Sequence, residues 1–374
     1  MKITTHRFAP LRRLLAGVLA AAVCAGALAG CGPASGSSTS QTAEGPQRYS
    51  TIFYDVFDTV TTVIAYCDSQ EEFNAQMEAL HADLKTYNDL YDIYHDYEGI
   101  HNIKTINDNA GVAPVQVDEK IIDMLEEAVE MYQVTDGQTN VALGSVLLLW
   151  HEHRDAAEDS PEHATLPAQE ELEAAAAHCS IEDVVIDREA GTVYLADPDM
   201  RLDVGSCGKG YACEQVAQAA EARGLTSALI SVGGNLRAIG EKPGGAQWTG
   251  AVEDPWNASA VYDANSAYVS AVYLDGNMAM VTSGDYQRYY EVDGVRYHHL
   301  IDPDTLYPAT WFNSVTVMCA DSGLADCLST GLFCMSLEDG QALVESLDGV
   351  EALWCLSDKT IVTSSGWSDH VMES

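Results

Sequence analysis

The chain has 374 residues, of which 47% are hydrophobic and 20% are charged, so it is long enough for one large domain or two that pack closely together. Its 57 acidic residues against 18 lysines and arginines give a formal net charge of −39. A protein with this charge repels the phosphates of nucleic acids, which excludes nonspecific nucleic-acid binding.

Residues 1–30 have the pattern of a secretory signal peptide. Basic residues precede an apolar, small-residue run that is too short to be a convincing membrane span. The run ends in Leu28-Ala29-Gly30-Cys31, which resembles a bacterial lipobox, so we expect cleavage before Cys31 and a lipid on that residue. The alternative is an ordinary cleaved signal peptide in which Cys31 has no role.

Residues 31–49 are rich in Gly, Ser, Pro and Thr and predict a flexible tether. The functional domain is then expected over residues 50–374. Loss of the basic residues of the leader moves the net charge from −39 to −43. We therefore expect an exported, acidic lipoprotein that its lipid anchors to the outer face of the cell membrane.

The first part of the domain predicts strands followed by helices. Residues 51–67 alternate apolar and polar side chains and predict one or two strands, and residues 69–92 have the apolar spacing of a helix. Residues 91–111 are polar and aromatic, which indicates an irregular functional surface. A second amphipathic helix is predicted over 117–134, and residues 152–179 form an acidic, alanine-rich insert whose second half is helical.

From residue 181 onward strands dominate. Asp293-Gly294 predicts the turn of a hairpin, residues 314–320 predict an apolar strand, and residues 322–335 predict a helix. The whole pattern indicates an α+β protein with mostly antiparallel sheets and packed helices.

Eight cysteines remain when Cys24 and Cys31 of the leader region are set aside. Most of them stand singly inside apolar runs, and none has the close spacing of a zinc site. We expect mostly buried free thiols that behave as small hydrophobic side chains, with a disulfide framework as the alternative.

Residues 201–214 read RLDVGSCGKGYACE, a strand-like start, a glycine-rich turn with one lysine, and the start of a helix. Such a turn exposes backbone N–H groups and places the positive end of the helix dipole beside an anion. This arrangement suits a phosphate group. The alternative is a strand-to-helix turn without a ligand.

Two further groups can carry chemistry. Asp326 and Thr330 lie one helical turn apart and can present two oxygens to a hard cation such as Mg²⁺, although an exposed Asp and a Thr bonded back to its own helix have the same spacing. His298 and His299 point to opposite faces of a strand, so they do not share a metal. One of them can act as a general base, and a polar strand end is the alternative.

Seven segments resemble, in family order, the FAD:protein FMN transferase (ApbE) family, and together they span about residues 51–367. They are DIYHDYEGIHNIKTIND, DGQTNVALGSVLLLW, LDVGSCGKGYA, LISVGGNLRAIG, VEDP, TSGDYQRYYEVDGVRYHHLIDP and DSGLADCLSTGLF. The resemblance implies an ApbE-like α+β body with a T-fold-like part. It also implies an enzyme that uses Mg²⁺ to move FMN from its substrate FAD to a threonine hydroxyl of an acceptor protein, as a phosphoester, with release of AMP. The alternatives are hydrolysis of FAD to FMN and AMP, and a flavin-binding lipoprotein without catalysis.

The resemblance further implies the roles of single residues. The Ser206 carbonyl, Asp326 and Thr330 would hold Mg²⁺, and His299 would lie near the FAD phosphates as the catalytic residue that helps deprotonate the acceptor hydroxyl. The positions that match family contacts with FAD are Tyr94, Gln138, Thr139, Asn140, Lys209 and His299.

The chain departs from the family pattern at three positions. The family often has Ala where Ser206 stands, which a carbonyl ligand tolerates, and Asp where Asn140 stands, which removes one negative charge. Phe57-Asp58-Thr59 replaces an early Met-Gly-Thr, so the role of Phe57 beside the flavin is left open.

Overall fold

The structure is a computed structural model that describes residues 45–257 and 267–372, so the predicted signal peptide, Cys31 and most of the predicted tether lie outside the described residues. Strand β1 (Gln47–Val56) already begins within the stretch that we assigned to the tether. In the described part of the chain, no helix combines the length and the apolar character that a membrane span requires.

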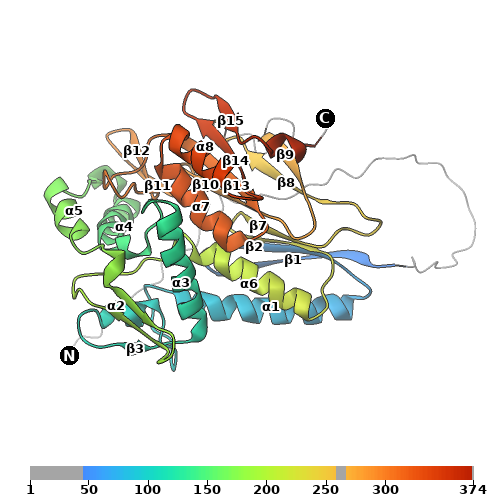
Figure 1. Ribbon diagram of the computed structural model, residues 1–374, viewed down its shortest axis with the longest axis horizontal. Coiled ribbons are helices and arrows are strands. Elements are labelled where there is room, and N and C mark those ends of the chain that lie inside the picture. Colours follow the sequence, from blue (N-terminus) through green and yellow to red (C-terminus); the bar gives the residue numbers. More distant parts are fainter. Residues whose placement is uncertain (1–44, 258–266, 373–374) are drawn as a thin grey trace, which may run out of the picture. The chain divides into compact units, whose positions relative to one another are not determined.

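An eight-stranded sheet forms the centre of the domain, and every pair of neighbouring strands in it is antiparallel (Figure 1). Its order is β1, β2 (Thr59–Cys67), β6 (Ala228–Val232), β7 (Asn235–Ile239), β10 (Ala279–Gly284), β13 (Phe312–Cys319), β14 (Glu351–Leu356) and β15 (Ile361–Thr363). Phe57 and Asp58 form the β1–β2 turn with φ angles of 56° and 48°. The strands expected over residues 51–67 are therefore a hairpin.

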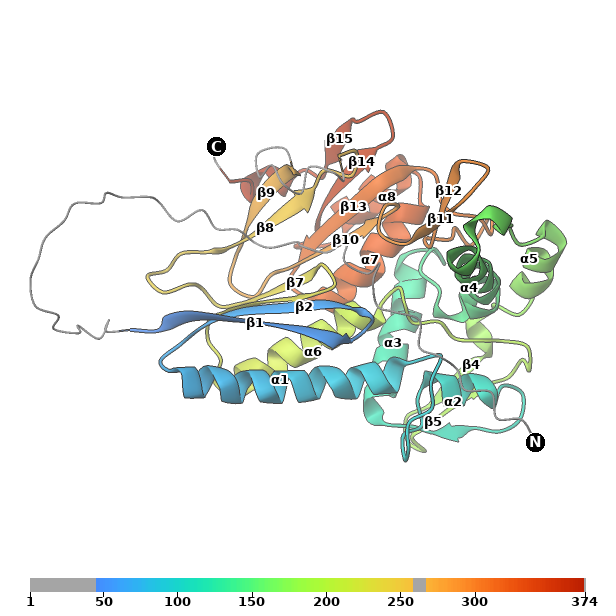
Figure 2. The same cartoon turned by 180° about the vertical axis from the view of Figure 1, so that it is seen from behind.

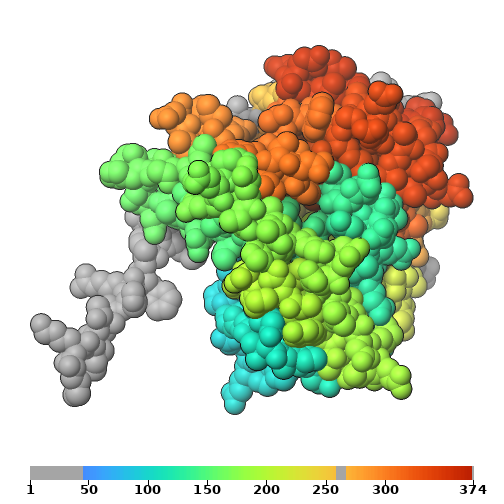
Figure 3. All heavy atoms as spheres, turned by 60° about the vertical axis from the view of Figure 1, so that its left-hand side comes forward, coloured from blue at the N-terminus to red at the C-terminus, as the bar shows by residue number. Residues whose placement is uncertain are grey.

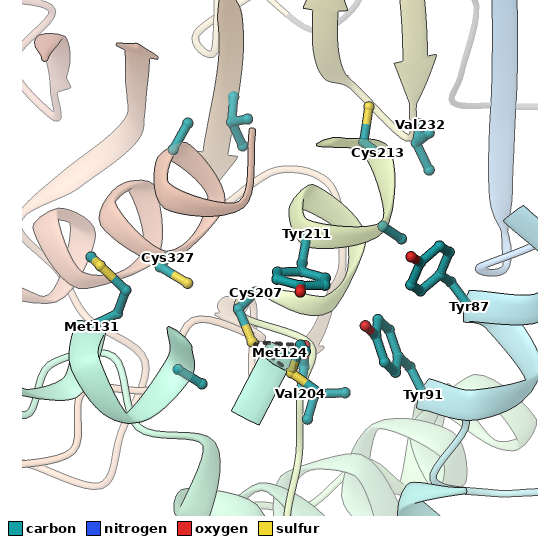
Figure 4. Packing of buried hydrophobic residues seen from close by; sticks show 14 of the residues in the cluster. Tyr87, Tyr91, Met124, Met131, Val204, Cys207, Tyr211, Cys213, Val232 and Cys327 are labelled. Atoms are coloured by element: carbon teal, nitrogen blue, oxygen red, sulfur yellow. Dashed lines mark hydrogen bonds between the residues drawn. The ribbon is translucent and has the colours of Figure 1, made fainter. Parts of the chain in front are cut away.

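Three helices, α1 (Gln70–Tyr91), α6 (Gly208–Ala222) and α7 (Ser322–Cys334), cover one face of this sheet (Figures 1 and 2). Helix α3 (Glu119–Val134) packs against α1 and α7. Tyr87 and Tyr91 of α1, Tyr211 of α6 and Met124 of α3 meet in the core around the start of α6 (Figure 4). The glycine-rich turn that precedes α6 is thus held by the largest apolar cluster of the domain.

The opposite face of the sheet carries the hairpin of β8 (Trp248–Glu253) and β9 (Tyr268–Leu274). Trp248 and Trp367 form a second core there with Met280 and Leu353 of the central sheet. Both faces of the sheet are therefore covered, and the α+β class expected from the sequence is confirmed.

A smaller sheet and several short elements complete the domain. They are α2 (Ile103–Asp108), β3 (Val115–Gln116), α4 (Gly144–Asp159), α5 (Gln169–Ala176), β4 (Val184–Asp187), β5 (Thr192–Leu195), β11 (Tyr289–Val292), β12 (Val295–His298) and α8 (Leu337–Ser346). The β11–β12 hairpin turns at Asp293-Gly294, as predicted.

Two expectations about local structure were wrong. Residues 91–111 are not irregular throughout, because Asn102 forms a capping box with Thr105 and starts the short helix α2. The first half of the insert over 152–179 is also helical: α4 continues to Asp159, since Trp150 and Ala157 keep one face of it buried despite the acidic composition.

All eight cysteines of the domain are free thiols, and seven of them are buried. The free thiols favoured by the sequence are confirmed, and the alternative disulfide framework is wrong. Cys207 lies in the core beside the Met124 sulfur at 3.7 Å, which is the behaviour of a small hydrophobic residue (Figure 4).

Candidate active site

The start of α6 meets the middle of α7 at Asp326. The Gly210 N–H donates to Asp326 Oδ2 at 2.7 Å, and Lys209 Nζ lies 3.8 Å from the same oxygen and also donates to the Gly205 carbonyl at 3.4 Å. The two helices approach so closely that a Cβ on Gly210 would stand 2.3 Å from the Asp326 Cβ. The amide groups expected to hold a phosphate therefore serve in part to hold a carboxylate.

Asp326 is a buried carboxylate with few stabilising partners; only 4% of the residue is exposed. Burial raises the pKa of Asp326, and the Lys209 charge and the Gly210 N–H offset only part of this effect. Asn235, at the start of β7, lies close enough to lower the pKa as well, but its Nδ2 makes no hydrogen bond of good geometry with a described residue. The site favours an additional cation next to this carboxylate.

The structure brings the predicted metal-binding positions to the same region. Ser206 precedes the first turn of α6, and its buried Oγ has no hydrogen-bond partner among the described residues. Thr330 is half-buried, one turn beyond Asp326 on α7. A backbone carbonyl, a carboxylate and a hydroxyl are all hard oxygen donors, the type that Mg²⁺ prefers, so the donor set fits the ion.

The loop of residues 138–140, which was expected to contact FAD, is hydrogen-bonded to α7. Thr139 is 1% exposed, and its hydroxyl donates to the Cys327 carbonyl at 2.7 Å, one residue after Asp326. We therefore expect Thr139 to position this loop. Gln138 donates to Asp304 at 3.1 Å, and Asn140 accepts from the Ala142 N–H at 2.9 Å as a helix cap.

The two neighbouring histidines differ in burial, but His299 lies beyond the end of β12 and both line one depression, so the predicted strand alternation does not separate them. His298 is buried and bonded to the Ala309 carbonyl at 2.9 Å, His299 is half-buried, and both line a depression of the surface. Burial, followed by the charge of Arg288, lowers the pKa of His299 to about 3. Its Nδ1–H donates to the Arg288 carbonyl at 3.2 Å, which leaves Nε2 as the acceptor of a neutral imidazole.

Tyr94 is half exposed and belongs to a chain of polar contacts that the sequence did not reveal. Its hydroxyl bonds to His151 Nδ1 at 3.1 Å, and His151 Nε2 lies 3.9 Å from the Asp203 carboxylate. Asp203 in turn accepts from the Gly205 N–H at 2.9 Å. The predicted FAD contact is thus connected to the turn that carries Ser206.

Asp203, His151 and Arg288 are the residues near the site that sequence reasoning missed. Asp203 and Arg288 lie inside segments quoted for the resemblance, so their position was a usable signal, whereas His151 directly follows such a segment. A separate cluster of His178, Asp197 and Asp199 brings three potential ligand atoms within 4.8 Å of one another. His178 and Asp197 already bond to each other at 2.7 Å, and we assign no ion there.

Comparisons with known proteins identify the family. The model of the ApbE family matches residues 57–354. The chain belongs to the ApbE family. Relatives named FAD:protein FMN transferase include those of Treponema pallidum, 34% identical over 72% of this chain and 74% of the relative, and of Klebsiella pneumoniae, 30% identical over 75% and 82%. The family and the enzyme class expected from the sequence are confirmed.

Solved structures of ApbE proteins share the fold. The protein from Thermotoga maritima superposes with a TM-score of 0.75 at 30% identity and covers 87% of this chain and 100% of its own. A flavin transferase ApbE from Vibrio cholerae gives a TM-score of 0.71 at 24% identity with the same shares, and this second likeness concerns the fold alone.

Proposed function

We propose that this ApbE protein transfers the FMN half of FAD to a threonine hydroxyl of an acceptor protein. The acceptor oxygen bonds to the FMN phosphorus, the bond from that phosphorus to the bridging oxygen breaks, and AMP leaves with the bridging oxygen. The observation that carries the proposal is the buried Asp326 beside Lys209 and the start of α6, in a chain whose relatives are FAD:protein FMN transferases.

The Ser206 carbonyl, Asp326 and Thr330 would hold Mg²⁺. The ion supplies positive charge that offsets the charge developing on the pyrophosphate. Lys209 adds a fixed positive charge next to Asp326 and orients the anionic substrate toward this end of α6. In a protein of net charge −39, an anionic dinucleotide requires such local cations.

His299 prepares the acceptor hydroxyl. Because its pKa is lowered to about 3, the imidazole is neutral at neutral pH, and its Nε2 can accept a hydrogen bond from the threonine hydroxyl. The same low pKa makes His299 a weak base, so we assign it the orientation of the hydroxyl and acceptance of the proton only as the new oxygen–phosphorus bond forms.

We also propose that Cys31 carries a lipid and holds the enzyme at the outer face of the cell membrane, where it meets its acceptor. The lipobox-like Leu28-Ala29-Gly30-Cys31 supports this. Replacement of Cys31 by Ser is expected to move the protein from the membrane fraction to the soluble fraction. Retention in the membrane fraction would contradict the anchor.

Mass spectrometry of an acceptor protein tests the transfer. The protein is incubated with FAD, Mg²⁺ and a threonine-bearing flavinylation domain, and the acceptor is expected to gain the mass of FMN minus water. A Thr-to-Val acceptor and a chelator each abolish the gain. Free FMN with an unmodified acceptor would indicate hydrolysis instead, and intact FAD would indicate binding without catalysis.

A further inference from the structure

A depression between α4 and the β11–β12 hairpin collects positive charge. Figure 3 shows α4, in green, against the orange hairpin. The charged and imidazole groups that line the depression are His151 and Arg154 from α4 and Arg288, His298 and His299 from the hairpin and its flanks, with Trp150 and Tyr290 among its aromatic walls. No carboxylate of the described residues lines it, although that of Asp203 lies 3.9 Å from His151 Nε2 in its wall.

Lysines and arginines are scarce in this chain, 18 against 57 acidic residues, and several arginines form salt bridges with carboxylates. Arg223 pairs with Asp83 at 2.7 Å and Arg237 with Glu214 at 2.7 Å. Arg288 has no carboxylate within salt-bridge distance in the described ranges, 45–257 and 267–372. Among the described residues, the carboxylate that pairs with Arg154 is that of its exposed neighbour Asp155, at 3.0 Å, and Arg154 also acts on the Tyr94 hydroxyl. Two arginines with little compensation line one depression of a strongly acidic protein.

The shared lining of the depression brings these two arginines close to His151 and His299. Burial is the main cause of the lowered pKa of His151; the charges of Arg154 and Arg288 add to it, and those of Asp203 and Asp155 oppose it. Burial is also the main cause of the lowered pKa of His299, with smaller contributions from Arg288 and Lys209. His299 lines the depression together with Arg154 and Arg288, and the Lys209 charge also acts on its pKa. A pyrophosphate has two phosphates, and planar guanidinium groups bind phosphate oxygens in pairs.

We propose that Arg154 and Arg288 bind the phosphate of the adenylate half of FAD and stabilise it as AMP departs. This inference rests on the proposed function, in which Lys209 and the Asp326 site serve the phosphate that is transferred. When the bridging oxygen leaves with AMP, it takes a new negative charge, and two guanidinium groups lower the free energy of that charge. His151 and Arg154 lie on consecutive turns of α4, so one helix face presents both to the same anion.

Binding titrations with AMP, FMN and FAD test which half of the substrate the two arginines contact. The variants are Arg288→Ala, Arg154→Ala and Arg288→Lys, with Arg48→Ala as a charge-matched control on the exposed part of β1, remote from the depression. In the presence of Mg²⁺, calorimetric titration measures AMP, and flavin fluorescence measures FAD and FMN. Each alanine variant is expected to bind AMP and FAD at least about tenfold more weakly and FMN within about twofold. The melting temperature stays unchanged, and Arg288→Lys restores part of the loss.

Several results would overturn the assignment. If both alanine variants bind AMP as tightly as the wild type, or if Arg48→Ala loses as much AMP affinity as they do, then Arg154 and Arg288 do not bind the adenylate phosphate. If FMN affinity falls as much as AMP affinity, the flavin phosphate lies at the depression instead. A wild-type protein that does not bind AMP would also contradict the assignment. Failure of the transfer proposal is distinguishable: wild-type protein that binds AMP and FAD but leaves the acceptor unmodified disproves transfer, while the arginine contacts are still measured by the titrations.

Discussion

Asp326 illustrates how a single buried charge constrains this site. A carboxylate transferred from water to a protein interior requires compensation by hydrogen bonds or cations, and here one backbone N–H at 2.7 Å and one ammonium at 3.8 Å supply it. Both come from the first turn of α6. The carboxylate therefore fixes the position of the glycine-rich turn in addition to any ligand that it holds.

Replacing Asp326 by Asn tests the charge without removing the bond to Gly210, because an amide oxygen still accepts the N–H. We expect FMN transfer to fall by more than about 100-fold, since the negative ligand proposed for Mg²⁺ would be lost. Asp321→Asn is the matched control: Asp321 caps the same helix through the Gly323 and Leu324 N–H groups, and Asn caps equally well. Normal transfer by Asp326→Asn in a chelator would contradict the assignment.

Glu127 of α3 is half-buried, and its surroundings favour the protonated form of its carboxyl group. Burial, followed by the charges of Asp321 and Glu214, raises the pKa of Glu127 to about 8 from an ordinary value of 4.5. Its Oε1 is buried without a hydrogen-bond partner among the described residues. The folded protein thus keeps this proton up to about pH 8, whereas the unfolded chain loses it near pH 4.5.

The ionised form of Glu127 therefore costs stability that grows as the pH rises from 4.5 to 8 and is constant above that range. Glu127→Gln copies the protonated form, so we expect it to be more stable than the wild type by about 1–3 kcal/mol at pH 9 and about equal at pH 5. Thermal unfolding at the two pH values measures this. The exposed Glu158→Gln on α4 is the control, and a pH-independent difference would be inconsistent with the raised pKa.

At the scale of elements, α6 and α7 are joined by contacts that allow almost no extra volume. Glu214 of α6 accepts from Arg237 of β7 and from the Ser322 N–H at the start of α7, so one buried carboxylate connects all three elements. Ser329 of α7 bonds to Ser283 of β10 at 2.8 Å. These bonds hold the two halves of the candidate site to the central sheet.

Gly210→Ala tests this close approach. The added Cβ would lie 2.3 Å from both the Asp326 Cβ and the Ser322 carbonyl oxygen, so the helices must separate. We expect a loss of about 1–3 kcal/mol in unfolding free energy together with weaker binding of Mg²⁺, measured by denaturant unfolding and metal titration. Gly208→Ala, two residues earlier, meets its nearest neighbours at 3.4 Å and is expected to be tolerated. Equal effects of both substitutions would show that helix separation is not the cause.

For the whole molecule, core thiols and an acidic exterior are the prominent features. The seven buried cysteines pack as hydrophobic side chains, and burial raises the pKa values of thiols such as Cys213 and Cys319 to about 12. We expect a domain that lacks Cys24 and Cys31 to show at most one fast-reacting thiol with a disulfide-exchange reagent in the native state, that of Cys179. All eight react once the protein is unfolded. Several fast-reacting thiols in the native state would contradict this core.

Much of the fold followed from local patterns in the chain. The Asp293-Gly294 turn and the apolar spacing of α1 and α7 were correct because propensity and side-chain period act over a few residues. Helix α2 was missed because it has only six residues, of which Ile103 and Ile106 alone are apolar, and it begins at the Asn102 capping box. The extent of α4 was missed because its buried face shows only after tertiary contacts form.

Some residues of the candidate site could be named from local motifs, and others only from tertiary contacts. Lys209, Asp326, Thr330 and His299 were named from short motifs whose residues are close in sequence, and the role of Thr139 in fastening its loop emerged only from its contact with α7. Arg288 and His151 gave no signal by spacing, because they come from segments more than 130 residues apart and meet only across the depression.

The sequence by itself determined the α+β class and the ApbE family, since these depend on local propensity and on motifs in order, and it named the residues proposed to bear the chemistry. Only the tertiary structure decided that Asp326 is buried against the first turn of α6, that His299 is kept neutral, and that two weakly paired arginines face one depression. The reason is physical: burial, a pKa and a shared surface depend on which distant segments come together when the chain folds.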